Sequence, residues 1–316
     1  MRNPDRPPRV SRSAATSANI GARLMLGALC IIWGITWPMM KVALIEIPPL
    51  TMRAMAAALG AATLYLLCLV MRRSLRIPSA RAWVHVVIAS LLNIVAFSLF
   101  SAFAQLAAAT SRVTILAYTM PIWSVLLAWL FLGERPNRMQ AIALGLCAVG
   151  LAILIYPLTS HGVPLGILYA VGVGVCWAGG TVYLKWAHID ADPMGLGSWQ
   201  MTIAFVILTA CMVVFEGFHP RLGTAHPDAY LATTWTGIVG NGVAYALWFT
   251  VVRRLPAVTA SLGVLAVPVI GIVASFLILG EIPTAPDMVG FALIFVASAC
   301  VLLTRETVAE TEAHAA

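Results

Sequence analysis

The second half of this chain repeats the first at a nearly constant spacing. The matching pairs are Trp33 and Trp177 and Lys41 and Lys185 (144 residues apart), Pro121 and Pro268 and Glu134 and Glu281 (147 apart), and Asn93 and Asn241 (148 apart). An offset that changes by only a few residues indicates a duplication with small insertions or deletions in loops. We therefore expect two copies of one structural unit.

Composition places both copies in a membrane. Hydrophobic residues make up 61% of the chain and charged residues only 10%, whereas about a quarter of a soluble domain is charged. A helix needs about 20 mostly apolar residues to cross a bilayer. Runs of that kind predict ten spans, at residues 23–43, 49–71, 82–106, 112–132, 138–156, 164–186, 194–216, 229–252, 257–279 and 285–304.

The basic residues predict the orientation in the membrane. With the N-terminus on the cytoplasmic side, fifteen Lys and Arg residues fall on that side and three on the other. Cytoplasmic loops are enriched in Lys and Arg, so both termini are expected in the cytoplasm. The net charge of +7 is thus an orientation signal, and no nucleic-acid partner is expected.

Together these patterns predict an all-α membrane protein with ten transmembrane helices arranged as two inverted five-helix repeats. Five spans per repeat is an odd number, so the second repeat must enter the membrane from the opposite side. The expected organisation is a disordered cytoplasmic tail at 1–22, a first repeat at 23–156, a linker at 157–163, a second repeat at 164–304 and a cytoplasmic tail at 305–316. Duplicated hydrophobic spans are common in secondary transporters, which bind substrate between the repeats.

Several motifs resemble the EamA type of the drug/metabolite transporter superfamily. They are Trp33-Gly34 with Lys41 and Pro48-Pro49, the stretch from Ala109 through Pro121 to Leu132-Gly133-Glu134-Arg135, and its copy from Val258 to Glu281. The resemblance covers about residues 23–304. It implies a ten-span carrier of the plasma (inner) membrane that exports amino acids, other metabolites or drugs.

Polar and aromatic side chains at matched depth in the two repeats are the candidate substrate-binding residues. Asn93 and Asn241 lie mid-span, where an amide is costly unless it is hydrogen-bonded. Phe97 and Tyr245 follow one helical turn later, on the same face. The predicted set is Trp33, Trp37, Asn93, Phe97, Tyr118, Trp177, Asn241, Tyr245 and Trp248, which would form a cavity with aromatic walls. Helix–helix hydrogen bonds and ordinary aromatic packing are the alternative explanations.

Two prolines and two charged pairs suggest moving parts. Pro121 and Pro268 are predicted to kink spans four and nine and to free backbone carbonyls. The candidate gates are Lys41 with Glu281 on the outer side and Lys185 with Glu134 on the cytoplasmic side. Alternatively, the lysines snorkel and the glutamates cap helices. Arg53, whose counterpart is Gln200, is expected to snorkel to the outer face.

Several sequence features that other kinds of transporter or enzyme would need are absent from this chain. No Asp or Glu occupies the middle of a predicted span, which disfavours cationic drugs as substrates. The chain has no glycine-rich phosphate loop with a lysine, so ATP is not the expected energy source. The six cysteines are scattered through the spans and suit packing. No metal, cofactor or catalytic residue is predicted.

The sequence therefore predicts a secondary active transporter for a small neutral or zwitterionic metabolite, an amino acid first, working by alternating access. Its expected partners are that substrate and the lipid bilayer. A permease of the same fold for drugs or other metabolites, a membrane-embedded transferase and a helical scaffold are the alternatives. A homodimer stays open, because Gly145 and Gly150 could pack helices within or between protomers.

Overall fold

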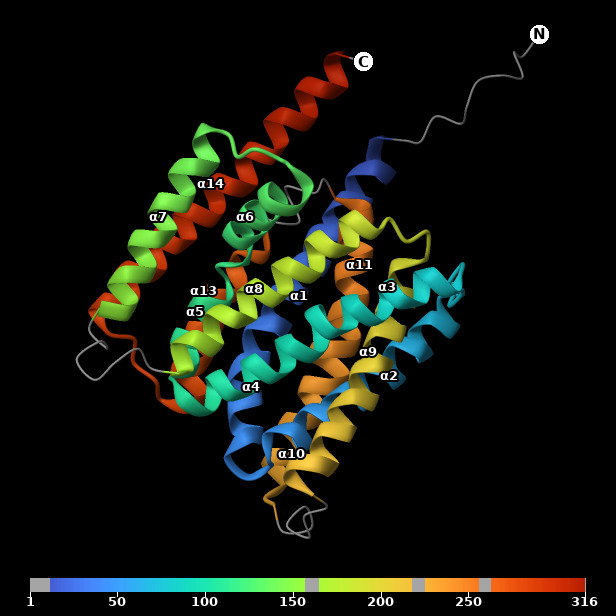
Figure 1. Ribbon diagram of the computed structural model, residues 1–316, viewed down its shortest axis with the longest axis vertical. Coiled ribbons are helices and arrows are strands. Elements are labelled where there is room, and N and C mark those ends of the chain that lie inside the picture. Colours follow the sequence, from blue (N-terminus) through green and yellow to red (C-terminus); the bar gives the residue numbers. More distant parts are fainter. Residues whose placement is uncertain (1–11, 157–164, 218–224, 256–262, 316) are drawn as a thin grey trace.

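The computed structural model describes residues 12–156, 165–217, 225–255 and 263–315, and this part of the chain contains helices and no strand (Figure 1). The α-helices are α1 (Arg12–Glu46), α2 (Pro49–Val70), α3 (Ala80–Ser90), α4 (Phe97–Ala107), α5 (Thr110–Ala117), α6 (Met120–Leu132), α7 (Arg138–Ile155), α8 (Leu165–Ala187), α9 (Pro193–Cys211), α10 (Pro227–Thr234), α11 (Ala244–Arg254), α13 (Ala266–Leu279) and α14 (Ala285–Ala315). Three π-helical segments, η1 (Leu91–Ala96), η3 (Met212–Glu216) and η5 (Trp235–Val243), continue α3, α9 and α10 without a break.

The helices are long and apolar enough to cross a membrane. Eight helical runs within the described residues have the length and hydropathy of a span, and Ala266–Leu279 and Ala285–Cys300 are shorter apolar helices. The all-α prediction is confirmed. Residues 256–262, which belong to the predicted ninth span, lie outside the described residues.

Both terminal helices extend beyond the predicted spans. The helix α1 begins at Arg12, so the expected tail at 1–22 is helical from Arg12 onward, and residues 1–11 lie outside the described part. The helix α14 likewise runs to Ala315, through the tail predicted at 305–316. Both stretches are rich in alanine and contain no proline, which favours continuation of the helix.

The two halves are interlocked. In Figure 1, α1 runs away from the end that holds the C-terminal end of α14, and α8, the first helix of the second half, runs toward it. The helix α1 packs against α13, α10 and α11, and α8 packs against α4, α6 and α5. The first helix of each half therefore packs mainly on the other half. We call the end that holds the start of α1 and the end of α14 the terminal end.

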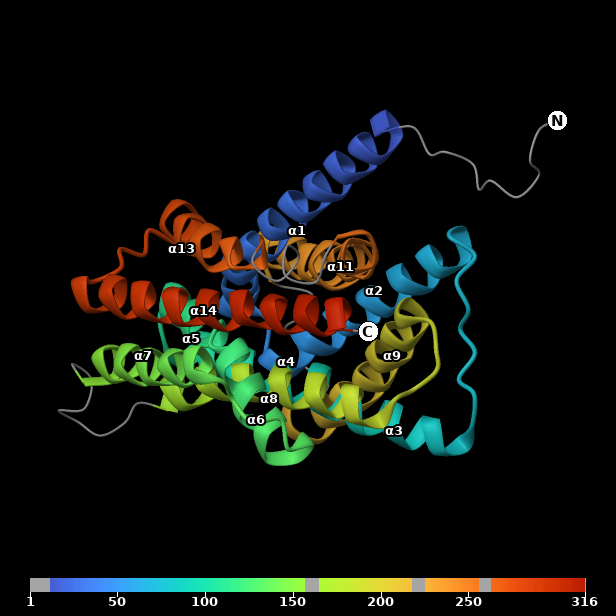
Figure 2. The ribbon, with the colours of Figure 1, turned by 90° about the horizontal axis from the view of Figure 1, so that it is seen from above.

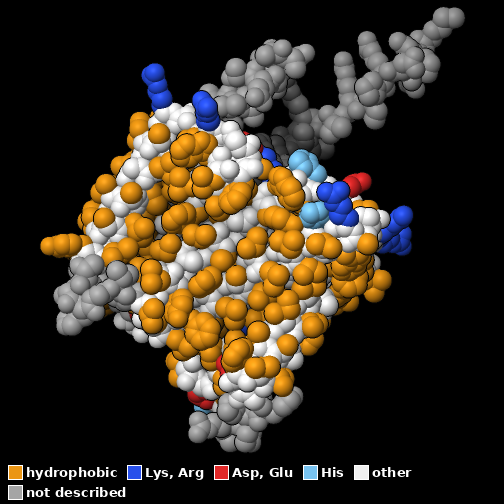
Figure 3. All heavy atoms as spheres, viewed as in Figure 1, with side chains coloured by type: hydrophobic (Ala, Val, Ile, Leu, Met, Phe, Trp, Pro, Cys, Tyr) orange, Lys and Arg blue, Asp and Glu red, His pale blue; other side chains and the backbone are white. Residues whose placement is uncertain are grey.

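Peripheral helices complete the bundle on two sides. Seen from the terminal end in Figure 2, α7 lies beside α14 at one edge, and α2 lies with α9 at the other edge. Hydrophobic side chains cover the face shown in Figure 3, and most of the Lys and Arg side chains visible there lie toward the terminal end. Such a surface suits a bilayer around the middle of the bundle.

Candidate functional site

A cavity of about 220 Å³ lies at the centre of the bundle, between the halves. Its wall combines residues from α1, α2, α4, α6, α8, η5 and α11 with residues that precede α6 and α13. The lining residues are Trp33, Thr36, Trp37, Met40, Arg53, Phe97, Tyr118, Met120, Pro121, Ser124, Trp177, Thr181, Thr236, Gly240, Asn241, Tyr245, Trp248, Val264 and Leu265. Four predicted spans of the first half and three of the second half thus contribute to one cavity.

Eight of the nine predicted substrate-binding residues line this cavity, and Asn93 is the exception. The aromatic rings among them form a connected wall. The ring centroids of Phe97 and Trp177 are 5.5 Å apart, and those of Trp177 and Tyr245 are 6.1 Å apart. Trp33 continues the wall, with its ring 6.1 Å from Tyr245 and 6.0 Å from Trp248. These separations suit tilted and edge-to-face aromatic contacts.

Helical periodicity places the four residues that α1 contributes to the cavity wall on one face of the helix. Trp33, Thr36, Trp37 and Met40 follow one another at spacings of three, one and three residues, so they lie along one stripe. The indole N–H of Trp33 donates to the Gly240 carbonyl in η5 at 3.2 Å. This bond satisfies a buried donor and joins the first half to the second half beside the cavity.

The two candidate asparagines lie in π-helical segments at corresponding positions of the halves. Asn241 lies in η5, lines the cavity and donates to the Ala56 carbonyl at 3.5 Å. Asn93 lies in η1, but its side chain packs against Gly180 of α8, where an added Cβ would come within 2.0 Å of the Asn93 Oδ1. The expectation that both amides face one cavity is therefore wrong for Asn93. Asn93 is the third residue of η1 and Asn241 the seventh of η5, so different lengths of π-helix precede the two side chains, which repeat spacing alone does not reveal.

The two proline-bearing spans are broken rather than kinked. The helix α5 ends at Ala117 and α6 begins at Met120, so Pro121 occupies the first turn of α6, where its missing N–H is not needed. Pro268 similarly lies in the first turn of α13, and it does not line the cavity. At the first break the Thr119 hydroxyl donates to the Leu116 carbonyl at 2.6 Å. Tyr118 and Pro121, on the two sides of the first break, both line the cavity.

Arg53 differs most from its prediction. It is 5% exposed and lines the cavity, whereas snorkelling to the outer surface was expected. Its face of α2 also carries Ala56, Ala57 and Gly60, small residues that are packed against other helices. Because that face is turned into the bundle, the arginine side chain extends inward. Gln200, its counterpart in the second half, is buried in α9 and is not part of the cavity wall.

Only one of the two candidate gate pairs forms. Lys185 and Glu134 make a salt bridge of 2.5 Å at the terminal end, with both side chains substantially exposed. Among the described residues Lys41 forms no salt bridge with Glu281: its ammonium donates to the Gln105 carbonyl. The Glu281 carboxylate instead accepts from the backbone N–H groups of Thr110 and Ser111 at 2.8 and 2.9 Å, at the start of α5.

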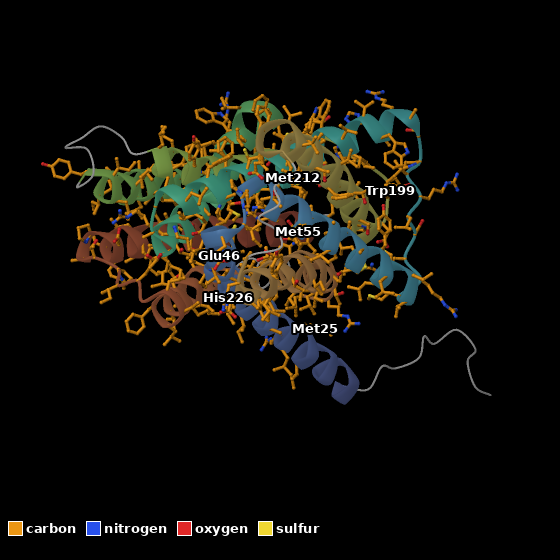
Figure 4. The ribbon with its side chains drawn as sticks, turned by 90° about the horizontal axis from the view of Figure 1, so that it is seen from below. Met25, Glu46, Met55, Trp199, Met212 and His226 are labelled. Carbon is orange, nitrogen blue, oxygen red and sulfur yellow. The ribbon has the colours of Figure 1, made fainter. Side chains whose placement is uncertain are left out.

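These contacts close the end of the bundle opposite the terminal end. The Gln105 side chain donates to the Trp37 carbonyl at 3.0 Å and accepts from the Thr110 hydroxyl at 2.8 Å. Gln105 and Thr110 are fully buried. Together with Lys41 and Glu281 they join α1, α4, α5 and the end of α13. A further contact at this end joins Glu46 to the backbone N–H of His226 at 2.5 Å, and the two residues lie near each other in Figure 4.

Exposure of the lining residues shows where the cavity opens. Met40 and Thr236 are buried, at 3% and 1% exposure, whereas Thr181 in α8 is exposed. The chain from Thr181 to the end of α8 at Ala187 leads to the terminal end (Figure 1). At Thr181 the cavity wall thus reaches the surface, on the part of α8 nearer the terminal end, whereas it is buried at Met40 and Thr236.

Sequence reasoning missed several other wall residues. Thr36 and Met40 could have been found from helical spacing to Trp33 and Trp37, because they complete the same stripe. Met120, Ser124 and Thr181 carry no signal of their own, since small and flexible side chains in a membrane span usually pack between helices.

Comparison with known proteins decides the family. The sequence profile of the EamA-like transporter family matches residues 20–156 and again residues 164–303. The chain belongs to this family. The two matches correspond to the two repeats expected from the internal duplication, and the predicted resemblance is confirmed.

Individual relatives of the chain are also described as transporters. The "Uncharacterized transporter YvbV" of Bacillus subtilis (strain 168) is 28% identical, over 89% of this chain and 91% of that protein. The "Probable terminal-alkyne amino-acid exporter" of Streptantibioticus cattleyicolor is 24% identical, over 83% of this chain and 87% of that protein. A solved crystal structure is similar in fold, with a TM-score of 0.62 and 21% identity, covering 94% of this chain and 99% of that one.

Proposed function

We propose that this protein is a secondary active transporter that exports a small neutral or zwitterionic metabolite, an amino acid first, across the plasma membrane. Substrate would bind in the central cavity while the terminal end is open to the cytoplasm. Closure at that end and opening at the other would then release it outside. Family membership supports transport, and the substrate, the direction and the mechanism are our proposal.

The observation that carries this proposal is the cavity itself. It lies between the two halves, where transporters built from repeats bind substrate. Its volume of about 220 Å³ is below the roughly 300–1,000 Å³ of pockets for drug-sized ligands, which favours a small metabolite over a drug. Five aromatic residues with rings in mutual contact supply apolar walls for a side chain of that metabolite.

The charges of the wall limit the substrate further. No Asp or Glu lines the cavity in the described residues, and residues 256–262 contain none in sequence. A permanently cationic drug would therefore find no carboxylate there. An ammonium group that belongs to a zwitterion could lie over a tryptophan face, since aromatic faces attract cations. The name of the Streptantibioticus relative, an amino-acid exporter, agrees with this choice.

The decisive experiment is transport by the purified protein. Cells that overproduce it should first be screened for resistance to toxic amino acids and other metabolites. Candidates from the screen should then be tested by counterflow in proteoliposomes. We expect saturable exchange of at least one small metabolite, with no requirement for ATP.

A pair of tryptophan variants provides the control. Trp177→Ala removes a ring of the cavity wall, whereas Trp129→Ala removes a ring on the outer surface of α6, which is 47% exposed. Exchange should fall severalfold in the first and persist in the second. Exchange that is equally fast in both variants, or absent for every metabolite in the unaltered protein, would rule out the proposed function.

A further inference from the structure

The buried arginine of the cavity wall has a positive charge without a negative partner. Arg53 forms no salt bridge among the described residues, and its two recorded hydrogen bonds, to the Ser101 hydroxyl and the Met40 sulfur, both come from Nη2. Its Nε is buried and has no hydrogen-bond partner. A guanidinium has five N–H donors, so most of its donor capacity is unused.

The acidic side chains that could neutralise Arg53 are engaged elsewhere. Glu216 accepts from the start of α2 and Glu281 from the start of α5. Asp287 pairs with Arg112, Glu134 with Lys185, and Asp192 lies near Arg73. Each of these groups lies at a helix end, away from the cavity wall. In the part of the chain that the structure describes, no carboxylate therefore pairs with Arg53.

Burying a charge is costly unless it is paired and hydrogen-bonded. Charged residues inside membrane spans usually face a cavity and mark the path of a substrate or ion. Arg53 lines the cavity together with Asn241 and Tyr245, and both of its hydrogen bonds use Nη2, which leaves Nη1 for a further acceptor. The missing acceptor can therefore come from a molecule that enters the cavity.

We infer that the transported metabolite carries one carboxylate, which binds to Arg53, while its apolar part packs against the tryptophan wall. This inference rests on the proposed transport of a small metabolite through the cavity. A guanidinium matches a carboxylate in shape and can donate two parallel hydrogen bonds to it. Arg53 is the only Lys or Arg among the described residues of the wall, so one negative charge is matched and a dianion such as a phosphate monoester is not.

The second repeat contributes no counterpart of this arginine to the cavity wall. Gln200 replaces the arginine in α9 and lies away from the cavity. The single arginine gives the cavity one cationic pole, which can bind an anion, with aromatic faces around the rest.

The test measures binding to the purified full-length protein in lipid nanodiscs, with two pairs of probes. The first pair is L-leucine and L-leucinamide, and the second is 4-methylpentanoate and 4-methylpentanamide. Members of a pair have nearly the same size and differ in the carboxylate. We expect the carboxylate to bind about tenfold to a hundredfold more tightly than the amide in at least one pair, which corresponds to about 1.4–2.8 kcal/mol.

Three variants test whether Arg53 causes the preference for the carboxylate over the amide. Arg53→Gln should abolish it, and Arg53→Lys should keep part of it because the charge remains but the planar fork is lost. Arg254→Gln is the matched control, because the same substitution at an exposed arginine outside the cavity should change nothing. Thermal unfolding without ligand separates the explanations. A site for substrate predicts that Arg53→Gln unfolds at the same or a higher temperature, whereas a purely structural arginine predicts a lower one.

The outcomes separate this inference from the proposed function. If neutral metabolites are exchanged equally well by the unaltered protein and by Arg53→Gln, transport stands and the carboxylate inference is wrong. If amino acids are not exchanged but 4-methylpentanoate binds through Arg53, the inference stands and the amino-acid assignment fails. Failure of the unaltered protein to prefer either carboxylate, including failure to bind any probe, overturns the inference even if Arg53→Gln cannot be purified.

Discussion

Asn93 and Asn241 occupy matching positions in the halves but have different neighbours. Asn241 lines the cavity, and its only recorded hydrogen bond, to the Ala56 carbonyl, is long at 3.5 Å. Its amide is thus available to a ligand. Asn93 is packed on Gly180, and its Oδ1 is buried without a partner in the described structure. Side chains of one type at equivalent places in the sequence therefore need not share a role.

Replacing each asparagine by alanine should separate these roles. Asn241→Ala should weaken substrate binding about twofold to tenfold, because a buried hydrogen bond contributes about 0.5–1.5 kcal/mol net. Asn93→Ala should leave affinity unchanged and alter only the unfolding temperature. Counterflow kinetics in proteoliposomes and thermal unfolding measure the two effects. Equal losses of affinity in both variants would contradict the placement of Asn93 outside the cavity.

At the scale of elements, close backbone approach holds α2 against η5. A Cβ added at Gly237 would lie 2.7 Å from the Leu59 Cβ and 2.9 Å from the Ala56 carbonyl oxygen. Backbone atoms cannot move aside as a flexible side chain can, so a larger residue must separate the two helices. Since η5 also carries Asn241, this contact fixes part of the cavity wall.

We therefore expect Gly237→Ala to destabilise the protein by about 1–3 kcal/mol, the usual effect of overpacking. The matched control is Gly145→Ala in α7, where an added Cβ meets no atom within 4 Å. That change should be neutral or should stabilise α7 by about 0.5–1 kcal/mol, because alanine favours a helix more than glycine does. Unfolding in detergent monitors both. A Gly237→Ala protein as stable as the Gly145→Ala protein would show that the helices are less closely packed than described.

Most element boundaries could be predicted because the bilayer requires long apolar runs. The runs predicted at 49–71, 112–132 and 138–156 match Pro49–Val70, Thr110–Leu132 and Arg138–Ile155 within two residues. The breaks within spans could not be placed, since proline removes a hydrogen bond without specifying whether the helix bends or stops. The sequence also did not reveal whether the Arg53 side chain points to the surface or into the bundle. A long side chain near a helix end can reach either the surface or the interior, and packing of the small-residue face decides between them.

For the whole molecule, the orientation in the membrane is a prediction that follows from fifteen basic residues on one side against three on the other. The start of α1 and the end of α14 lie at the same end of the bundle, as an even number of spans requires (Figure 1). We expect a green fluorescent protein fused after residue 316 to fluoresce and an alkaline phosphatase fused there to be inactive. The opposite result at both fusions would place the termini outside the cytoplasm.

Access to the cavity from one side provides the strictest test of the whole molecule. Thr181 lines the cavity and is exposed, whereas the buried network of Lys41, Gln105, Thr110 and Glu281 closes the other end. In a background without the six native cysteines, Thr181→Cys should react with a membrane-impermeant thiol reagent in inside-out vesicles and not in right-side-out vesicles. Gln105→Ala removes two of the hydrogen bonds that close the far end, so it should increase labelling of Thr181→Cys from outside.

The fusion proteins determine the orientation independently. Once they place the termini in the cytoplasm, labelling of Thr181→Cys mainly from outside would mean that the resting protein opens outward, contrary to the arrangement of its helices here.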